Sequence, residues 1–359
     1  MYTIHLLPAS FGDSILIEYG PAAKPHYILI DGGPYFNFPE MIKGLKRAAP
    51  GLQELELLVV THIDIDHIDG TITLLNQENM PFKINEVWFN GYRELEKVKD
   101  DIMGPLQGEY LSLVIKAKEF KHNTKFGNNA VMVDDYKKLP EFTLPGGMKI
   151  TLLSPGADVL RQQKVKWKEE IKEIEKEQTV KQRWKEETRY DDVIDDLLGS
   201  SIEKWQAEEP KKDTSLANKS SIAFIGTYAG KCCLFAGDAT SDWLLEAISP
   251  LLASMGKNRL KLDAWKLAHH GSKGSTLDRL MEKIECKTML ISSDGKRYQH
   301  PDPECLAKLL KYNGPGILFY FNYKTEQTMR WQNKKWQEKH GFESFYPEGE
   351  NGISIRLDK

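Results

Sequence analysis

The sequence predicts an α/β protein that folds as an αββα sandwich, with its functional site at the edges of the two sheets. Strand-like runs precede helix-like runs in both halves of the chain, and no internal repeat is evident. Clusters of His, Asp and Gly follow directly after apolar strand-like runs. The 359 residues could form one large domain or two ordinary ones, and we expect a single domain over residues 1–359.

Hydrophobic patterning predicts the elements of the first half of the chain. A β-hairpin is expected at the start, with its two strands joined by residues 8–13 (PASFGD). Apolar runs predict strands over residues 2–7, 14–19, 27–30, 57–60, 86–89 and 148–153. Helical spacing predicts helices over residues 37–49, 68–75 and 105–121.

The same patterning resumes near residue 218 and continues to the end of the chain. Strands are expected over residues 222–227, 231–236, 262–268, 288–292, 317–321 and 351–355. Helices are expected over residues 240–254 and 303–311. A turn at Ala229-Gly230 predicts that the first two of these strands pair with each other.

Between these halves the composition changes abruptly, because Lys, Glu, Asp and Arg dominate from about residue 161 to residue 212. A narrow apolar stripe at helical spacing is formed by Trp167, Ile171, Ile174 and Trp184. We interpret residues 157–215 as a charged helical insertion that can be separated from the core. It is either a solvated helix pair or an element that binds a protein partner or gates the site.

Composition excludes several classes of protein. The formal net charge of −3 and the pI near 6.3 give no global basic footprint, so a polyanion would need a local patch or a metal. No apolar run approaches the length of a membrane span, and the N-terminus lacks a signal-peptide pattern. Cys232 and Cys233 are adjacent, and the four cysteines form no disulfide framework. We therefore expect a reducing, cytoplasmic location without membrane contact.

Residues 57–70 (LLVVTHIDIDHIDG) are the most informative stretch. An apolar strand ends in two histidines and two aspartates, namely His62, Asp64, Asp66 and His67. Alternate side chains of an extended segment share a face, so the first three can point the same way. Imidazole and carboxylate groups that converge on one point favour a divalent metal. The alternative is an acidic turn in which an aspartate caps the start of a helix.

Two further polar clusters follow strands in the second half. Asp238 ends the run LFAGD, and burying an unpaired carboxylate there would be costly. His269 and His270 stand in tandem before Gly-Ser, directly after an apolar strand. If strand geometry persists, only one of the two histidines can point at a metal. We predict His270 as the ligand and His269 as a substrate-side or supporting group.

Residues 61–70 resemble the HxHxDH signature of the metallo-β-lactamase superfamily, with Asp64 in place of the second histidine. This replacement is similar to the soluble hydrolase domain of ComEC-type DNA-uptake proteins and of their free-standing relatives. Residues 12–14 (GDS) are similar to the opening of those domains. Residues 296–301 (KRYQHP) resemble their RYGHP stretch, with Gln299 in place of glycine. The resemblance covers nearly the whole chain apart from the insertion and implies a metallo-β-lactamase sandwich.

The resemblance also implies a centre of two divalent metals, bridged by Asp238, with Asp31 orienting the ligand loop. Asn218 stands where the superfamily usually carries a ligand histidine. The first metal site would be formed by His62, Asp64, Asn218 and Asp238. The second metal site would be formed by Asp66, His67, Asp238 and His270. The first site is rich in hard oxygen donors and the second resembles a zinc site, so we expect Zn²⁺ and/or Mn²⁺, with Mg²⁺ as another candidate.

The expected function is a metal-dependent phosphodiester hydrolase, a nuclease that cuts DNA through a metal-bound hydroxide. By analogy with the superfamily, Asp66 would orient the attacking water. Arg297 and His300 would hold the phosphate through charge-assisted hydrogen bonds. His269 or His300 would protonate the leaving group.

Two other functions stay open. A hydrolase of a small ester or phosphodiester, including nucleotide second messengers, suits a chain without basic excess. A non-catalytic scaffold would instead bind a protein partner through the insertion. A DNA substrate would be favoured by a basic face assembled from Lys116, Lys118, Lys121, Lys125, Lys257, Arg259 and Lys273.

Overall fold

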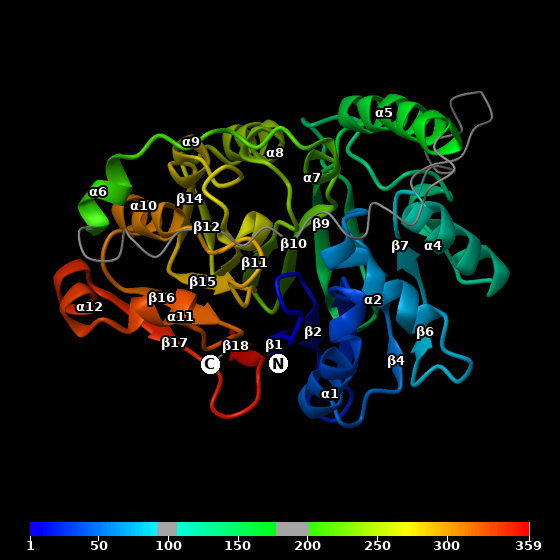
Figure 1. Ribbon diagram of the computed structural model, residues 1–359, viewed down its shortest axis with the longest axis horizontal. Coiled ribbons are helices and arrows are strands. Elements are labelled where there is room, and N and C mark those ends of the chain that lie inside the picture. Colours follow the sequence, from blue (N-terminus) through cyan, green and yellow to red (C-terminus); the bar gives the residue numbers. More distant parts are fainter. Residues whose placement is uncertain (92–105, 177–200, 359) are drawn as a thin grey trace.

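The computed structural model describes residues 1–91, 106–176 and 201–358. Two large sheets lie at the centre of the molecule (Figure 1). Across the six-stranded sheet the strands follow one another in the order β18 (Ile353–Arg356), β1 (Tyr2–Leu6), β2 (Ile15–Tyr19), β3 (His26–Ile30), β5 (Leu57–Val59) and β7 (Val87–Trp88). Across the eight-stranded sheet the strands follow one another in the order β17 (Phe342–Phe345), β16 (Ile317–Phe321), β15 (Thr288–Ile291), β13 (Ala264–Lys266), β11 (Lys231–Phe235), β10 (Ala223–Tyr228), β9 (Lys149–Ser154) and β8 (Glu141–Thr143).

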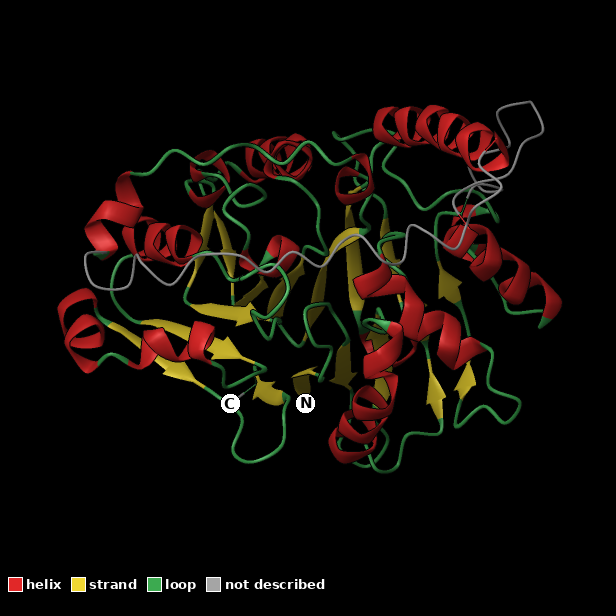
Figure 2. Cartoon of the chain, in the orientation of Figure 1, coloured by secondary structure: helices red, strands yellow, loops and turns green. Residues whose placement is uncertain are grey.

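Helices cover the outer face of each sheet (Figure 2). The helices that pack on the six-stranded sheet are α1 (Phe38–Ala48), α2 (Ile65–Leu75) and α4 (Leu106–Ala117). Those that pack on the eight-stranded sheet include α8 (Ser241–Met255), α9 (Asp278–Met281) and α10 (Pro303–Asn313). The remaining α-helices are α5 (Ala157–Lys176), α6 (Ile202–Ala207), α7 (Leu216–Lys219), α11 (Glu326–Met329) and α12 (Lys334–His340).

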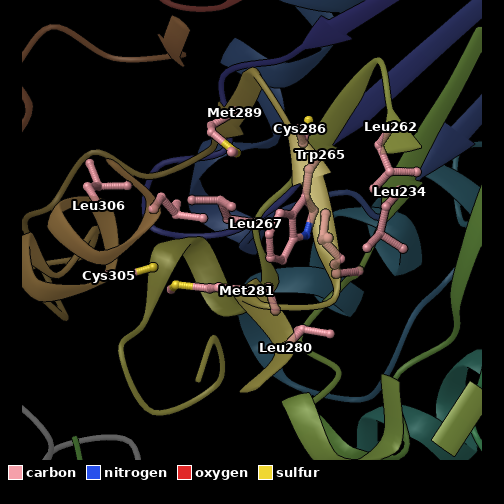
Figure 3. Packing of buried hydrophobic residues seen from close by; sticks show 14 of the residues in the cluster. Leu234, Leu262, Trp265, Leu267, Leu280, Met281, Cys286, Met289, Cys305 and Leu306 are labelled. Carbon is pink, nitrogen blue, oxygen red and sulfur yellow. The ribbon is translucent and has the colours of Figure 1, made fainter. Parts of the chain in front are cut away.

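Strand alternation divides the core into three hydrophobic layers. Leu57 and Val59 on β5 face the eight-stranded sheet and pack in the layer between the sheets. Leu58 packs on the opposite side, against the helices that cover the six-stranded sheet. In the third layer, Trp265 on β13 packs with Leu280 and its neighbours beneath α8–α10 (Figure 3). Helix, sheet, sheet and helix layers confirm the predicted αββα sandwich.

The carboxyl ends of parallel strands from both sheets meet at one edge of the sandwich. In the six-stranded sheet β3 and β5 are parallel. In the eight-stranded sheet β11, β13 and β15 are parallel. The strands β3, β5, β11 and β13 lead directly into Asp31, Thr61, Asp238 and His269. The fold therefore brings together polar clusters that are far apart in the sequence, as the sequence predicted.

Two details of the predicted elements are wrong. The helix expected from residue 68 begins at Ile65, with Asp64 in the N-cap position, so the extended segment ends before Asp66 and His67. The strand expected over residues 262–268 is interrupted at Asp263. Its first part is β12 (Leu260–Leu262), which pairs with β14 (Ile284–Cys286) in a separate two-stranded sheet. Another small sheet joins β4 (Glu54–Leu55) and β6 (Lys83–Ile84).

The charged segment begins as the helix α5 and ends with α6. Ile202 and Trp205 of α6 are buried in the cluster that contains α10, and Trp205 packs against Trp331 and Trp336. Residues 202–207 are therefore part of the core, and the expected separability does not extend to them. The predicted stripe of Trp167, Ile171, Ile174 and Trp184 lies outside the described side chains, and the boundaries 157–215 stay a prediction.

Among the residues that the structure describes, no helix combines the length and the apolar character needed to cross a bilayer.

Candidate metal centre

The loop between β5 and α2 is held in place by the carboxylate of Asp31. Its Oδ1 accepts from the Thr61 backbone N–H (2.8 Å), and its Oδ2 accepts from the Thr61 hydroxyl (2.7 Å). Oδ2 also lies 2.8 Å from Nδ1 of His67. Because an ionised carboxylate can only accept, Nδ1 of His67 must be the protonated nitrogen, which leaves Nε2 as a potential metal ligand. Asp31 therefore has the orienting position that the resemblance implied.

Glycines allow the chain to pass close to this loop. A Cβ on Gly12 would lie 1.9 Å from the carbonyl oxygen of Asp66, and one on Gly70 would lie 2.0 Å from that of Gly32. Both contacts are shorter than any side chain tolerates. The hairpin loop and the helix α2 thus reach the site only because these positions lack side chains.

Three histidines from different elements direct their Nε2 atoms towards the same buried region. The Nε2 atoms of His62 and His67 lie 3.9 and 3.4 Å from carboxylate oxygens of Asp238. Nε2 of His270 lies 4.0 Å from Asp238 and 3.3 Å from Oδ2 of Asp66. The three Nε2 atoms and Oδ1 of Asp238 are buried. None of these four atoms has a hydrogen-bond partner within the described part of the chain.

Buried polar atoms without partners are costly, so their convergence indicates a site for a cation. Ligand atoms of His62, His67 and Asp238 lie within 4.8 Å of one another, as do those of Asp66, His67 and His270. These donors, imidazole nitrogen and carboxylate oxygen, are those of Zn²⁺ and Mn²⁺ sites. The residues therefore fit a metal centre, with His67 common to both groups.

Electrostatics point to the same requirement for positive charge. Burial would lower the pKa of His270, but the carboxylates of Asp13 and Asp238 raise it to about 9. Burial opposes ionisation of Asp238, but His67, His269 and His270 hold its pKa well below the usual range. Protons or a metal cation can supply this charge, and metal binding would displace the protons from the imidazoles.

A buried ion pair orients His270 from behind. Nδ1 of His270 lies 2.9 Å from the backbone carbonyl of Ser292 and 3.3 Å from Oδ1 of Asp13. The other carboxylate oxygen of Asp13 accepts from the fully buried ammonium group of Lys266 at 2.7 Å. Nδ1 of His270 must donate to the carbonyl oxygen, so Nε2 faces the centre as an acceptor. The predicted Gly-Asp-Ser loop thus supports the centre through Asp13.

The tandem histidines do not follow strand geometry, because β13 ends at Lys266 and both residues have positive φ (48° and 54°). His270 is fully buried, whereas the side chain of His269 is 26% exposed. Nε2 of His269 lies 3.8 Å from Oδ2 of Asp238. Both histidines can therefore face the same carboxylate, and the argument that only one could do so fails because the strand stops early.

Of the residues predicted for the first metal site, Asp64 is partly exposed and Asn218 is buried. The side chain of Asp64 is 43% exposed, and its Oδ2 lies 3.5 Å from Nε2 of His62. Asn218 is buried, and its Nδ2 donates to Asp213 at 2.7 Å. Its Oδ1 is buried and has no hydrogen-bond partner among the described residues. The amide oxygen is therefore available as a ligand atom.

Asp213 is a site residue that the sequence did not reveal. Its carboxylate accepts from Asn218 and from the hydroxyl of Ser275 (2.8 Å), and it lies 3.2 Å from Nδ1 of His269. Burial would raise its pKa, but hydrogen bonds from His269, Asn218, the Ser215 backbone and Ser275 lower it to about 2. A lone aspartate at the end of a charged segment carries no pattern that distinguishes it from its solvated neighbours.

His300 lies beside His269, and Arg297 lies beside Phe11. The rings of His300 and His269 are 5.2 Å apart, and Nδ1 of His300 lies 3.2 Å from Asp302. Burial lowers the pKa of His300. The guanidinium of Arg297 lies 4.9 Å from the ring centre of Phe11. A pocket of about 510 Å³ opens beside His269, lined by residues 208–211 and 272–274 with Asp213 and Asp302.

The basic face that would favour a DNA substrate is not formed by these lysines and arginines. Lys116 belongs to α4, at one end of the molecule, whereas Arg259 lies beside β12, well separated from α4 in Figure 1. The guanidinium of Arg259 donates to backbone carbonyls of Met281 and Tyr312. Lys273 is paired with Glu208 and Glu304 at 2.8 Å. The lysines and arginines are thus divided between distant elements, and some are neutralised.

Comparisons with known proteins give one sequence relative and several structural neighbours. The chain is 28% identical over 102 residues to ComE operon protein 3 of Bacillus subtilis (strain 168), which is 28% of this chain and 12% of that protein. No protein-family model matches the chain. Zinc-bound PqqB of Methylobacterium extorquens is similar with a TM-score of 0.41 and 13% identity, over 99% of this chain and 100% of PqqB. CmlA, a diiron β-hydroxylase of Streptomyces venezuelae, is similar with a TM-score of 0.42 and 10% identity, over 99% of this chain and 54% of CmlA.

The fold of the present chain follows from its own four layers and from the position of the histidine and aspartate cluster at the carboxyl ends of the strands. Its resemblance to the ComEC type is supported by the match to ComE operon protein 3.

Proposed function

We propose that this protein is a metal-dependent phosphodiester hydrolase and that its substrate is DNA. One observation carries the proposal. Buried imidazole nitrogens of His62, His67 and His270 converge with a carboxylate oxygen of Asp238, and none has a hydrogen-bond partner among the described residues. Such a set of donors has little use except to bind a cation.

The ligands are assigned to two metal positions that share Asp238. The first position takes His62, Asp64, Asn218 and Asp238, and the second takes Asp66, His67, Asp238 and His270. Divalent ions held there would supply Lewis acidity for a phosphoryl oxygen and would lower the pKa of a water molecule. His67 is a ligand of the second position, and its Nε2 atom also lies 3.4 Å from the shared carboxylate of Asp238, so its replacement would disturb both positions.

The remaining residues have roles around the reacting phosphate. Asp66 would orient the water, because its carboxylate lies at the centre beside His270. His269 would pass a proton to the leaving oxygen, because it is partly exposed and is fixed through Nδ1 by Asp213. His300 and Arg297 would contact the phosphate from the neighbouring loop, where charge-assisted hydrogen bonds favour an anion.

DNA is supported as the substrate by the ComEC-type motifs and by the sequence match to ComE operon protein 3. We propose that the insertion, about residues 157–215, is an element of the single domain. Residues of the insertion outside α6 would bind a protein partner.

A small ester or phosphodiester is the second candidate substrate, and one observation favours it. The ammonium group of Lys273, which borders the pocket beside His269, is held by Glu208 and Glu304. It is therefore not free to bind a second phosphate, as a long polyanion would require.

The test compares two substrates in one protein sample during a salt titration. Hydrolysis of DNA should weaken sharply with added salt, because binding of neighbouring phosphates releases counterions. Hydrolysis of bis-p-nitrophenyl phosphate should barely change. Turnover of the small diester without any cleavage of DNA, under Mn²⁺, Mg²⁺ or Zn²⁺, would replace the nuclease proposal with the second candidate.

The variant His67→Ala should abolish both activities together, because both depend on the same centre. His340→Ala is the matched control, since His340 ends α12, far from the centre (Figure 1), and should leave both activities unchanged. If His67→Ala retained either activity, the assignment of the site would be wrong.

A further inference from the structure

Exposed aromatic side chains lie beside the candidate metal centre. Phe36 is 63% exposed and Tyr298 is 45% exposed, although large aromatic side chains are usually buried. Both pack against the ring of Phe11, which is itself buried, at ring-centre distances of 5.8 and 5.6 Å. Phe11 thus supports two accessible rings from beneath. We call Phe36, Phe11 and Tyr298 the aromatic row.

The aromatic row continues to the centre through two histidines. The ring of Tyr298 lies 6.4 Å from that of His300, and the two planes are inclined by 33°. The ring of His300 lies 5.2 Å from that of His269. His269 in turn faces Asp238. A continuous series of rings therefore leads from the surface at Phe36 to the carboxylate between the proposed metal positions.

The loops that carry Phe11 and Tyr298 are tied to each other and to the centre. The hydroxyl of Ser10 donates to Asp294 at 2.9 Å, and the backbone N–H of Asp294 donates to the carbonyl of Ser10 at 2.9 Å. Next to Phe11, the carbonyl of Gly12 accepts from the hydroxyl of Ser292 at 2.8 Å. The backbone of Gly12 touches Asp66. These contacts fix the distance between the aromatic row and the centre.

A positive charge accompanies the rings. The guanidinium of Arg297 lies 4.9 Å from the ring centre of Phe11 and 5.2 Å from that of Tyr298. Cation–π contacts of this kind hold the arginine between the two rings. The surface therefore combines flat aromatic faces with a cation, and it adjoins a site suited to phosphate chemistry.

We propose that the aromatic row stacks the bases of an unpaired nucleic-acid strand whose phosphate lies at the metal centre. This inference rests on the proposed function and specifies its substrate as single-stranded. Bases in a duplex are stacked on each other and cannot lie on protein rings, whereas unpaired bases can. Stacking adds to the affinity that phosphate contacts supply, so the aromatic row would supplement the guanidinium of Arg297 in a chain of net charge −3.

The test measures binding of two single-stranded oligonucleotides of equal length, an oligo-dT and an abasic analogue with the same phosphates. Both oligonucleotides carry phosphorothioate linkages that resist cleavage, so that fluorescence anisotropy reads binding by the metal-loaded protein. In Phe36→Ala and in Tyr298→Ala, affinity for oligo-dT should fall about tenfold, because each base–aromatic stack contributes an effect of this order. Affinity for the abasic strand should stay unchanged. Tyr298→Phe should retain wild-type affinity, because it keeps the ring.

The matched control is Tyr110→Ala, which removes a 49% exposed aromatic side chain from α4 and should change neither affinity. Equal affinity of the wild type for both oligonucleotides, or an unchanged affinity for oligo-dT in Phe36→Ala and Tyr298→Ala, would overturn the inference. The inference would also be overturned if Phe36→Ala, without oligonucleotide, had a lower sedimentation coefficient than the wild type. That result would show that the aromatic row lies between two copies of the chain.

Two outcomes distinguish an error in the aromatic row from an error in the proposed function. A wild-type protein that cuts DNA, but whose aromatic variants bind oligo-dT normally, contradicts only the aromatic row. A wild-type protein that hydrolyses bis-p-nitrophenyl phosphate but binds and cuts no oligonucleotide contradicts both.

Discussion

At the scale of single residues, the centre depends on carboxylates that fix imidazoles from behind. Asp31 orients His67, Asp13 orients His270, and Asp213 lies against His269. In each pair Nδ1 faces the carboxylate, so Nε2 is directed towards Asp238. Removal of such a supporting group commonly lowers metal affinity or activity while the ligands themselves remain.

Asp213→Asn is predicted to lower kcat about tenfold to a hundredfold, because the position of His269 and Asn218 is no longer fixed by a carboxylate. The metal content at saturating Mn²⁺ should stay unchanged, since Asp213 is not proposed as a ligand. Steady-state kinetics and elemental analysis measure the two effects. Asp134→Asn, an exposed aspartate that does not line the pocket beside His269, is the control. An unchanged kcat in Asp213→Asn would show that this carboxylate has no role in catalysis.

The metal preference is predicted to depend on Asp64. Added Mn²⁺ should raise activity above that of the zinc-only protein, because the first position is rich in oxygen donors. Asp64→His adds an imidazole and should shift the maximum towards Zn²⁺. The side chain of Asp64 is 43% exposed, so the change should be tolerated. Exposed Asp134→His is the control. A maximum rate with Zn²⁺ alone in the wild type would contradict this assignment.

Most of the proposed ligands could be predicted from the sequence, because His62, Asp66 and His67 fall within one short motif directly after a strand. Asp213 could not be. Its partner His269 lies 56 residues further along the chain, and its neighbours are charged residues with no periodicity. The extended geometry expected at Asp66 was wrong. The alternation of apolar and polar residues continues past Asp64, but the backbone already enters α2 at Ile65.

At the scale of elements, the helix α2 must pack closely on the loop after β3 to place Asp66 and His67. Gly70→Ala is predicted to destabilise the protein by about 2 kcal/mol, since the added Cβ would meet the backbone of Gly32. It should also weaken metal binding, because α2 carries His67. Urea unfolding and metal titration measure these effects. The control is Gly51→Ala, where an added Cβ meets nothing within 4 Å. Equal stability of the two variants would contradict the packing argument.

The element α6 is predicted to contribute to the core although it lies in a charged segment. Trp205→Ala should lower the free energy of unfolding by about 3 kcal/mol, because Trp205 is buried against Trp331 and Trp336. Deleting residues 161–212 should therefore destabilise the fold instead of leaving it intact. Denaturant unfolding compares Trp205→Ala with the exposed Tyr110→Ala. If both variants were as stable as the wild type, α6 would be dispensable.

The helix α6 could not be predicted from the sequence, because charged residues surround its few apolar positions. Ile202 and Trp205 stand three residues apart among lysines and glutamates, so their helical turn is too short to give a periodic signal. Longer elements with clear periodicity, such as α1 and α8, were predicted to within a residue or two of their ends. The strands β8 (EFT) and β17 (FESF) were missed because polar residues interrupt their short sequences, so neither gives an apolar run.

At the scale of the whole molecule, the layers could be predicted from the alternation of strands and helices, but the strand order could not. The last strand, β18, pairs with β1 at the edge of the first sheet, and this contact joins the two ends of the chain. For the same reason the sequence could not show whether its lysines and arginines share one face, because that depends on which elements adjoin. Binding of a strand is instead proposed to depend on the aromatic row.

The central claim is that Asp238 joins two metal positions in a phosphodiester hydrolase. The most direct test measures bound metal by elemental analysis and DNA cleavage under Mn²⁺ in the wild type and in Asp238→Ala. Asp263→Ala, which changes a half-exposed carboxylate paired with Lys231, is the control. The account predicts up to two ions per chain in the wild type and in the control, and loss of both ions together with cleavage in Asp238→Ala. Full metal content in Asp238→Ala, or cleavage that persists without metal, would contradict it.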